Sequence, residues 1–290
     1  MFYWKSDNMC ALPDRAFPFL PINARASKPR AQGVTEIRGP YYTPMGTRYL
    51  EDILETMGEY VDALKFAGGS FALMPRPALT AVIDLCHRHD VLVSTGGFIE
   101  YVLGHGSDAV ESYLVEARNV GFDIVELSSG FITLPADDWL RLADRVQKLG
   151  LRSKPELGIR FGAGGATPVA PSANEDVRDP ALLVQLARRF LDAGAYMIMI
   201  ESEGITENID SWRTDTVAAI VGELGLGRIM FEAAEPAVFT WYVKHYGPDV
   251  NLFVDHSQIV QLECLRSGIW GTNELWGRVR TYRPSDTPDA

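Results

Sequence analysis

K-P-E-L-G-I-R-F-G-A-G-G at residues 154–165 and A-Y-M-I-M-I-E-S-E-G at residues 195–204 share one pattern, a short hydrophobic run that meets an acidic residue. The acid is Glu156 in the first stretch and Glu201 in the second. Short apolar runs bounded by Gly-rich or charged segments are typical of buried parallel strands. A carboxylate at the end of such a strand is costly unless positive charge lies beside it. We therefore expect a divalent metal or a charged substrate between these acids.

Two neighbouring stretches repeat the pattern. F-D-I-V-E-L-S-S-G at residues 122–130 contains Glu126, and R-I-M-F-E-A-A-E at residues 228–235 contains Glu232. Any one of these acids could pair with its own Arg or Lys, or cap the N-terminus of a helix. Four acids on four successive strand ends favour a shared site instead.

The chain from residue 34 onward repeats a unit of one short apolar strand and one amphipathic helix. The predicted strands are residues 34–38, 61–66, 91–94, 123–127, 153–159, 196–200, 228–231 and 251–254. The predicted helices are residues 47–57, 77–89, 108–120, 136–149, 181–193, a segment within 211–224, 236–246 and 258–267. Eight such units predict an α/β fold, the single-domain (β/α)8 TIM barrel.

The competing architecture is an open, doubly wound sheet. That fold usually carries a Gly-rich fingerprint after its first strand, and this chain has Arg38-Gly39-Pro40 there. We therefore favour a barrel over residues 34–270. Residues 1–33, which are rich in proline, are interpreted as an N-terminal extended arm, with a disordered tail as the alternative. Residues 271–290 are interpreted as a polar C-terminal tail.

Composition limits the possible partners. The 290 residues carry a formal net charge of −11, which argues against a nucleic-acid or anionic-membrane surface. No apolar run is long enough to span a membrane. Three cysteines, Cys10, Cys86 and Cys264, lack metal-binding spacing, so a reducing cytoplasmic location is the simplest expectation. The aromatic residues of the arm need cover, and we expect homo-oligomers.

The strand ends of a barrel form its active face, and the residues predicted there are of mixed charge. Carboxylate oxygens suit Mg²⁺, which commonly takes one or two carboxylates together with water and substrate oxygens. Cations and Gly-rich loops suit a small anionic substrate. The candidate metal ligands are Glu126, Glu156, Glu201 and Glu232. The candidate substrate-binding residues are Arg38, Gly97, Arg160, Gly164 and Asn251.

The candidate catalytic residues are Lys65, Glu156, Glu201 and His256. Lys65 follows a predicted buried strand, where a lysine can bind phosphate or carboxylate or form a Schiff base. One of the glutamates can act as general acid or base. His256 is the only histidine next to the predicted site, and it either transfers a proton or makes a hydrogen bond at the start of a helix.

Several of these segments together resemble the phosphosulfolactate synthase family, which includes plant heat-stress-associated 32-kDa proteins. The resemblance covers residues 33–280. It is carried by V-D-A-L-K-F-A-G-G, V-E-L-S, K-P-E-L-G, M-I-E-S-E-G, M-F-E-A, V-N-L-F-V-D-H and L-E-C-L-R.

The resemblance implies a Mg²⁺-dependent (β/α)8 lyase of coenzyme M biosynthesis that adds sulfite to phosphoenolpyruvate, giving phosphosulfolactate. It places Lys65 and the four glutamates in matching strand-end motifs, and Asn251 in the matching V-N-L. The archaeal members carry an arginine just after the strand-six glutamate, where this chain reads Ser202-Glu203-Gly204. Two alternatives follow. One is a related barrel enzyme with a different anionic or enolisable substrate in specialised metabolism, and the other is a non-catalytic stress-associated homologue.

Overall fold

Eight parallel strands close into a barrel, with β1 paired to β2 on one side and to β8 on the other. The computed structural model describes residues 15–160, 179–269 and 278–282. The strands are β1 Thr35–Arg38, β2 Ala63–Lys65, β3 Leu92–Ser94, β4 Ile124–Ser128, β5 Arg152–Leu157, β6 Ile198–Ile200, β7 Ile229–Glu232 and β8 Asn251–Asp255. Their order around the barrel follows the sequence, which confirms the predicted (β/α)8 fold.

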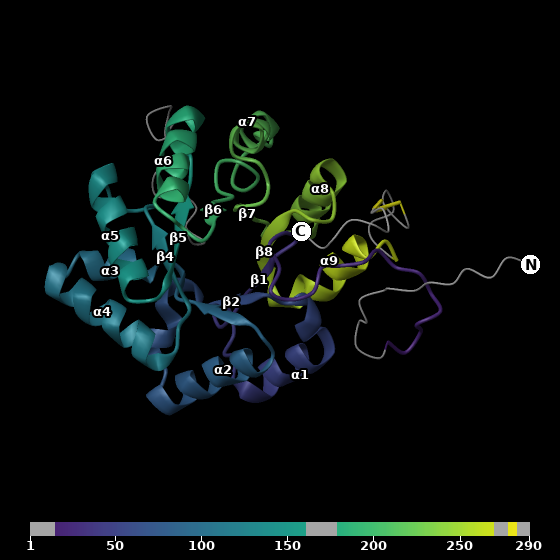
Figure 1. The fold of residues 1–290 in the computed structure, drawn as a ribbon, viewed down its shortest axis with the longest axis horizontal. Helices are drawn as coiled ribbons and strands as arrows, with labels where there is room; N and C mark the ends of the chain where they lie inside the picture. Colours follow the sequence, from purple (N-terminus) through teal and green to yellow (C-terminus); the bar gives the residue numbers. More distant parts are fainter. Residues whose placement is uncertain (1–14, 161–178, 270–277, 283–290) are drawn as a thin grey trace, which may run out of the picture.

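Helices surround the strands on all sides of the barrel (Figure 1). They are α1 Thr47–Met57, α2 Arg76–Arg88, α3 Ile99–Leu103, α4 Ser107–Val120, α5 Ala136–Lys148, α6 Pro180–Asp192, α7 Thr214–Leu224, α8 Pro236–Tyr246 and α9 Ile259–Arg266. The helix predicted at residues 181–193 is α6, which begins one residue earlier because Asp179 caps it. The Asp179 carboxylate accepts the Ala181 N–H at 2.8 Å.

Helical periodicity explains why the segments pack as they do. In α5 the buried residues are Trp139, Leu142, Ala143 and Val146, a spacing that lines one face of a helix. Each large apolar side chain buried in this way contributes roughly 1.5–3 kcal/mol relative to exposure. This face belongs to the main core, which lies between the strands and the helices.

The connection after β3 differs from the prediction of one helix at residues 108–120. A 3-10 turn, Gly96–Phe98, and the short helix α3 precede α4. Gly96 has φ of 61°, and a Cβ on it would overlap the carbonyl oxygen of Phe66, so the tight turn requires glycine. Local backbone geometry of this kind leaves no periodic pattern in the sequence.

Part of the predicted arm closes the N-terminal end of the barrel. Arg25 forms an ion pair with Glu263 of α9, and both side chains are nearly inaccessible to solvent. Arg30 Nη1 lies 2.9 Å from Asp62 Oδ1, just before β2. The Asn23 amide donates two hydrogen bonds to backbone carbonyls, of Arg266 and Val279. Residues 23–30 of the arm are therefore part of the folded barrel, and the cations Arg25 and Arg30 are buried.

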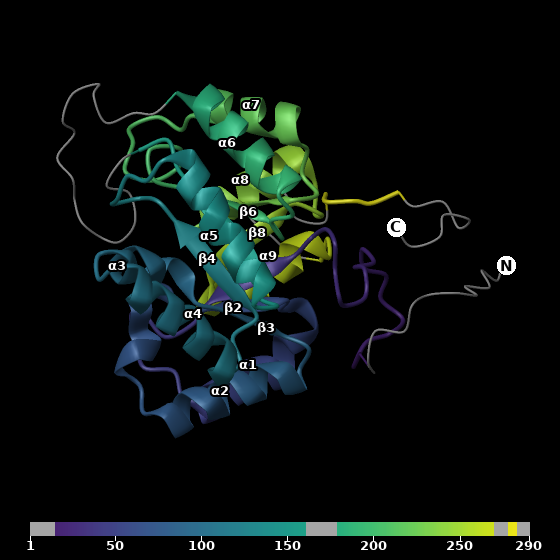
Figure 2. The same ribbon diagram turned by 60° about the vertical axis from the view of Figure 1, so that its left-hand side comes forward.

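The two ends of the described chain lie on one side of the barrel. In both views the purple arm and the short segment at residues 278–282 lie beyond α9 (Figures 1 and 2). The hydrogen bond from Asn23 to the carbonyl of Val279, 3.0 Å long, joins them. Residues 1–14 and most of the predicted tail lie outside the described residues.

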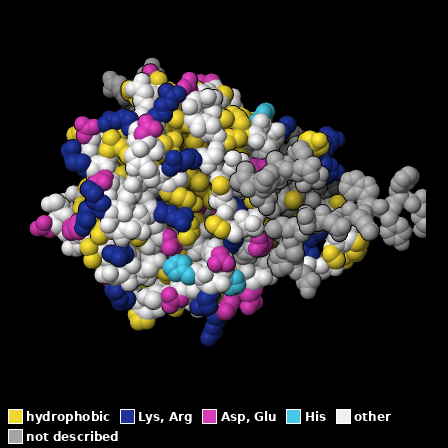
Figure 3. Space-filling view, viewed as in Figure 1, with side chains coloured by type: hydrophobic (Ala, Val, Ile, Leu, Met, Phe, Trp, Pro, Cys, Tyr) yellow, Lys and Arg dark blue, Asp and Glu magenta, His cyan; other side chains and the backbone are white. Residues whose placement is uncertain are grey.

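The surface shows both signs of charge interspersed over the face drawn in Figure 3. In the described part of the chain, none of the helices has the length and apolarity needed to cross a bilayer. Cys86 and Cys264 are free thiols, and Cys10 lies outside the described residues. Association into homo-oligomers stays a prediction.

Candidate active site

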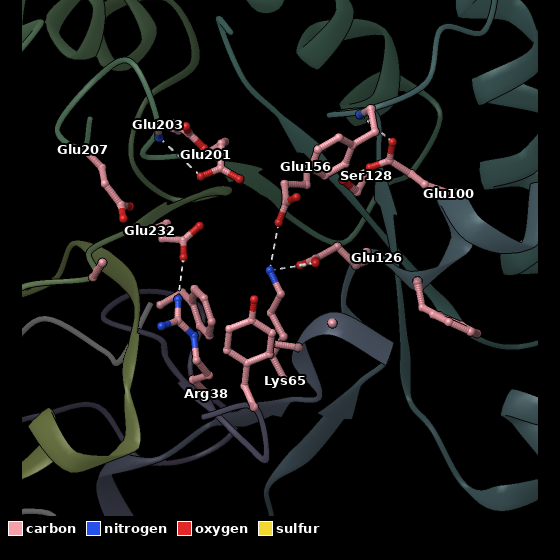
Figure 4. Close-up of a pocket in the computed structure, with 18 of the residues that line it drawn as sticks. Arg38, Lys65, Glu100, Glu126, Ser128, Glu156, Glu201, Glu203, Glu207 and Glu232 are labelled. Atoms are coloured by element: carbon pink, nitrogen blue, oxygen red, sulfur yellow. Dashed lines mark hydrogen bonds and ion pairs between the residues drawn. The ribbon is translucent and has the colours of Figure 1, made fainter. Parts of the chain in front are cut away.

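A cavity of about 340 Å³ opens at the C-terminal ends of the strands. Its described lining contains two cations and seven carboxylates, from β1, β2, β4, β5 and β7, from α3 and from the loop after β6 (Figure 4). The cations are Arg38 and Lys65, and the carboxylates are Glu100, Glu126, Glu156, Glu201, Glu203, Glu207 and Glu232. Lys65 and the four glutamates that the strand-end pattern singled out therefore meet in one cavity.

Lys65 lies at the centre of a group of charged residues, Lys65, Glu126 and Glu156, which form the charged floor of the cavity. Its Nζ lies 2.7 Å from Glu126 Oε1 and 2.8 Å from Glu156 Oε2. Burial alone would lower the pKa of Lys65, but the charges of Glu126 and Glu156 outweigh it and hold this pKa well above its ordinary value. Lys65 is therefore a permanent cation, which favours anion binding over Schiff-base chemistry because a Schiff base needs the neutral amine.

A second lysine lies beneath this floor. Lys154 Nζ is 3.1 Å from Glu126 Oε2 and also forms an ion pair with Glu36. Lys154, Glu36 and Glu126 are each at most 1% exposed. Burial opposes ionisation of Glu126, but Lys65 and Lys154 together lower its pKa. Alternating charges therefore run from Glu36 inside the barrel up to Glu156 at the cavity.

Glu156 ends this array on the side that faces the cavity. Burial, followed by the nearby charge of Glu126, raises the pKa of Glu156 to about 7. Its Oε2 accepts the bond from Lys65, so a bound proton would reside on Oε1. Near neutral pH, Glu156 can therefore hold and release a proton.

Arg38 forms a second positive centre on the other side of the cavity. Its Nη2 lies 2.8 Å from Glu232 Oε1, and both side chains are 11% exposed. The guanidinium also lies 5.1 Å from the ring centre of Phe253 and donates to the hydroxyl of Tyr42 at 3.2 Å. Arg38 also lines the cavity, so a small anion in the cavity can reach this cation.

Glu201 is buried without a cationic partner among the described side chains. Its Oε1 accepts the backbone N–H groups of Ser202 at 2.9 Å and Glu203 at 3.3 Å. Burial first, and then the charges of Glu232 and Glu156, raise the pKa of Glu201 well above its ordinary value. This corner of the cavity therefore favours either a proton on Glu201 or a bound cation.

The pKa of Glu156 predicts a pH-dependent stability. The folded-state pKa, about 7, exceeds the unfolded value near 4.5. The stabilising contribution is therefore complete below pH 4.5 and is lost as pH rises through 7. In buffer without divalent cations, the unfolding free energy of the wild type should fall between pH 5 and 8 by on the order of 2 kcal/mol more than that of Glu156→Gln. Urea denaturation measures this difference, and parallel curves for the variant and the wild type would contradict it.

The other predicted residues divide into three groups. Gly97 lines the cavity. Gly164 lies outside the described residues. Arg160, His256 and Asn251 are not among the described residues that line the cavity. Arg160 donates to the carbonyl of Asn208 at 3.3 Å.

His256 makes structural hydrogen bonds with both ring nitrogens. Its Nδ1 lies 2.9 Å from the carbonyl oxygen of Arg38, and its Nε2 lies 3.0 Å from the hydroxyl of Tyr49. These contacts fix the start of the segment after β8 against β1 and α1. The helix-start hydrogen bond itself is made by the neighbouring Asp255, which accepts the N–H of Ser257 at 3.0 Å. A role of His256 in proton transfer stays a prediction.

Asn251 lies at the opposite end of the barrel from the cavity, because it is the first residue of β8. Its side chain accepts the N–H of Val34 at 2.9 Å and donates to the carbonyl of Ile229 at 2.9 Å. Asn251→Ala should lower the unfolding free energy by about 2–3 kcal/mol and leave substrate KM within about twofold. Denaturation and steady-state kinetics measure the two effects. A large rise in KM with unchanged stability would restore the binding role.

The donor set partly fits Mg²⁺. Glu201 and Glu232 supply hard oxygens, and Glu201 is the buried carboxylate without a cation partner in the described ranges. Within those ranges, no three His, Cys, Asp or Glu side chains converge as a ready-made metal site. Glu126 is held on both oxygens by lysines. Of the four predicted ligands, Glu201 and Glu232 would be the best placed to hold such an ion, and water and substrate oxygens would complete its coordination.

Sequence reasoning missed several lining residues. Glu203 and Glu207 lie on the loop after β6, and Tyr41 and Phe131 lie on other loops. Loop side chains follow no period, so the sequence carried no signal for them. The position of Glu36 beneath the cavity could have been predicted. It lies two residues before Arg38 and therefore on the same face of β1.

Comparisons with known proteins place the chain in a family. The family model for (2R)-phospho-3-sulfolactate synthase (ComA) matches residues 23–272. The chain is 40% identical over 252 residues to Protein HEAT-STRESS-ASSOCIATED 32 of Arabidopsis thaliana, covering 83% of this chain and 88% of that protein. It is 29% identical over 263 residues to the phosphosulfolactate synthase of Methanothermobacter thermautotrophicus, covering 88% and 96%.

Among solved structures, the carboxyl transferase domain of Rhizobium etli pyruvate carboxylase with 3-bromopyruvate is similar, with a TM-score of 0.53. The identity is 13%, and the match covers 78% of this chain and 40% of that chain. At this identity the similarity shows the barrel fold alone.

Proposed function

The chain belongs to the (2R)-phospho-3-sulfolactate synthase (ComA) family, and from this premise we propose that it adds sulfite to phosphoenolpyruvate in a Mg²⁺-dependent reaction. The observation that carries the proposal is the convergence of Lys65, Arg38 and the strand-end glutamates on one cavity. In the proposed reaction the sulfur of sulfite bonds to carbon 3, the carbon–carbon double bond opens, and carbon 2 takes a proton. The product is phosphosulfolactate.

The cations of the cavity would bind the anionic groups of the substrate. Lys65 and Arg38 each lie against carboxylates, so their charges are already oriented and need little rearrangement when an anion binds. Placing the phosphoenolpyruvate carboxylate near Lys65 stabilises negative charge as it develops during the addition. Arg38 is the second anchor for a negatively charged group.

Glu156 is the proposed proton donor to carbon 2. Its pKa of about 7 keeps it partly protonated near neutral pH, and its Oε2 contact with Lys65 directs Oε1 away from the lysine. Glu201 and Glu232 would hold the metal, which supplies positive charge for the substrate carboxylate when bound. These assignments make Glu156 and the pair Glu201–Glu232 separately testable.

The test is direct. Purified protein with sulfite and Mg²⁺ should consume phosphoenolpyruvate, measured by loss of the ultraviolet absorbance of its enol double bond. Phosphorus NMR identifies the product. EDTA should abolish the reaction, and excess Mg²⁺ should restore it. Absence of turnover at saturating substrate and Mg²⁺ would refute the proposal.

The acidic loop after β6 favours a second candidate function. Glu203 and Glu207 line the cavity, and Glu207 has a pKa raised by burial. Two extra carboxylates disfavour a second small anion and suit a larger or less charged enolisable substrate. The rim residues Tyr42, Tyr101 and Phe131, each more than half exposed, offer apolar contact area for it. Tight binding of phosphoenolpyruvate without sulfite-dependent turnover would favour this candidate.

A further inference from the structure

Glu100 lines the cavity but has no role in the proposed reaction. It lies in the first turn of α3, and Figure 4 shows its carboxylate beside Ser128. The carboxylate accepts four hydrogen bonds from the end of β4 and the loop that follows. Oε1 accepts the hydroxyl of Ser128 and the N–H of Gly130, the latter at 3.0 Å. Oε2 accepts the N–H groups of Phe131 at 2.7 Å and Ile132 at 3.0 Å.

Three successive backbone N–H groups and a hydroxyl form a small anion-binding concavity. A carboxylate from another element of the same chain already fills it. Charge-assisted hydrogen bonds of this kind are about twice as strong as neutral ones. These four donors are therefore engaged, which leaves Lys65 and Arg38 as the cations of the described lining for a substrate anion.

The element that carries Glu100 is itself firmly packed. Phe98, just before α3, stacks on Tyr101 with ring centres 5.2 Å apart and packs edge-on against Phe71 at 5.2 Å. Gly97 approaches β4 so closely that a Cβ on it would lie 2.9 Å from the Cβ of Ser128. A fixed α3 can therefore impose its position on the loop after β4.

We propose that Glu100 is a positioning residue: its carboxylate holds residues 130–132 so that Ser128 and Phe131 form a fixed wall of the cavity. Figure 4 shows Ser128 and Glu100 across the cavity from Arg38 and Glu232. Phe131 is 54% exposed, so its own side chain has little packing to hold it, and its backbone bond to Glu100 supplies the constraint. The wall sets the width of the cavity, and its fixed position lowers the cost of ordering the site when substrate binds.

Hydrogen–deuterium exchange tests the proposal independently of activity. In Glu100→Ala the amides of residues 130–132 should exchange at least about tenfold faster, because their acceptor is gone. Glu100→Gln keeps one acceptor oxygen and should give an intermediate rate. Glu55→Ala, an exposed glutamate on α1, is the matched control and should leave the rates unchanged. Unchanged exchange in Glu100→Ala would overturn the proposal.

The kinetic arm rests on the proposed function. With phosphoenolpyruvate and sulfite, Glu100→Ala should raise KM about tenfold and change kcat by less than about threefold, because it loosens a wall and removes no reacting group. Ser128→Ala removes one of the four bonds and should give a smaller effect of the same kind, which covers the case in which Glu100→Ala fails to fold. A collapse of kcat at unchanged KM would overturn the positioning role. If the wild type shows no turnover, the proposed reaction is refuted, and the hydrogen–deuterium exchange experiment still tests the positioning role of Glu100.

Discussion

Lys65→Met is expected to lower kcat/KM for the proposed addition by at least about a thousandfold, equivalent to about 4 kcal/mol of transition-state stabilisation. The lysine lies between two carboxylates, 2.7 Å from Glu126 and 2.8 Å from Glu156. Removing its charge takes away one of the two described cations that line the cavity, so an anionic substrate is bound and stabilised less well. The pKa of Glu156 should also rise further, because the lysine that lowers it is gone.

Two variants control this experiment. Lys65→Arg keeps the charge in a different shape and should retain more activity than Lys65→Met. Lys148→Met removes a lysine from an exposed i,i+4 pair with Asp144 and should leave kcat/KM unchanged. Retention of more than about a tenth of wild-type activity in Lys65→Met would exclude Lys65 from the chemistry.

Lys154→Met is expected to cost about 3–5 kcal/mol of unfolding free energy. Lys154 is 1% exposed and pairs with Glu36 and Glu126, which are equally buried. Its loss leaves Glu36 as a buried carboxylate without its ion-pair partner. Glu126 keeps Lys65 as a partner, so the penalty falls mainly on Glu36.

The double variant Glu36→Gln/Lys154→Met separates this penalty from a packing defect. It removes both members of the pair, so no unpaired charge remains at Glu36, and it should recover at least half of the lost stability. Urea denaturation of the two single variants and the double variant completes the cycle. A double variant as unstable as Lys154→Met would point to packing instead.

The fold was predictable because its signals are periodic. The helix predicted at residues 236–246 is α8 with the same bounds. The other predicted helices begin and end within a few residues of their prediction. Amphipathic helices and apolar strands each leave a repeat in the sequence that their burial requires. The short helix α3 left no such repeat, because it depends on the glycine turn before it.

The site was predictable only where strand direction decides position. Glu126, Glu156, Glu201 and Glu232 lie at or near strand ends, so a parallel barrel brings them to one face. Asn251 shows the limit of this reasoning. It belongs to β8, which contributes Phe253 to the cavity. Asn251 begins that strand, which places it at the other end of the barrel. Residues on loops, such as Glu207, are placed by contacts that a linear pattern does not record.

The buried cations of the arm determine where this protein can be divided. The family match begins at residue 23, the same residue whose side chain first bonds to the barrel, through the carbonyls of Arg266 and Val279. A fragment that starts at β1 would leave Glu263 and Asp62 without Arg25 and Arg30. Chimaeras and circular permutants of this barrel should therefore join upstream of Asn23, so that the peptide from Asn23 to Arg30 stays in one piece with α9 and β2, next to the acids it neutralises.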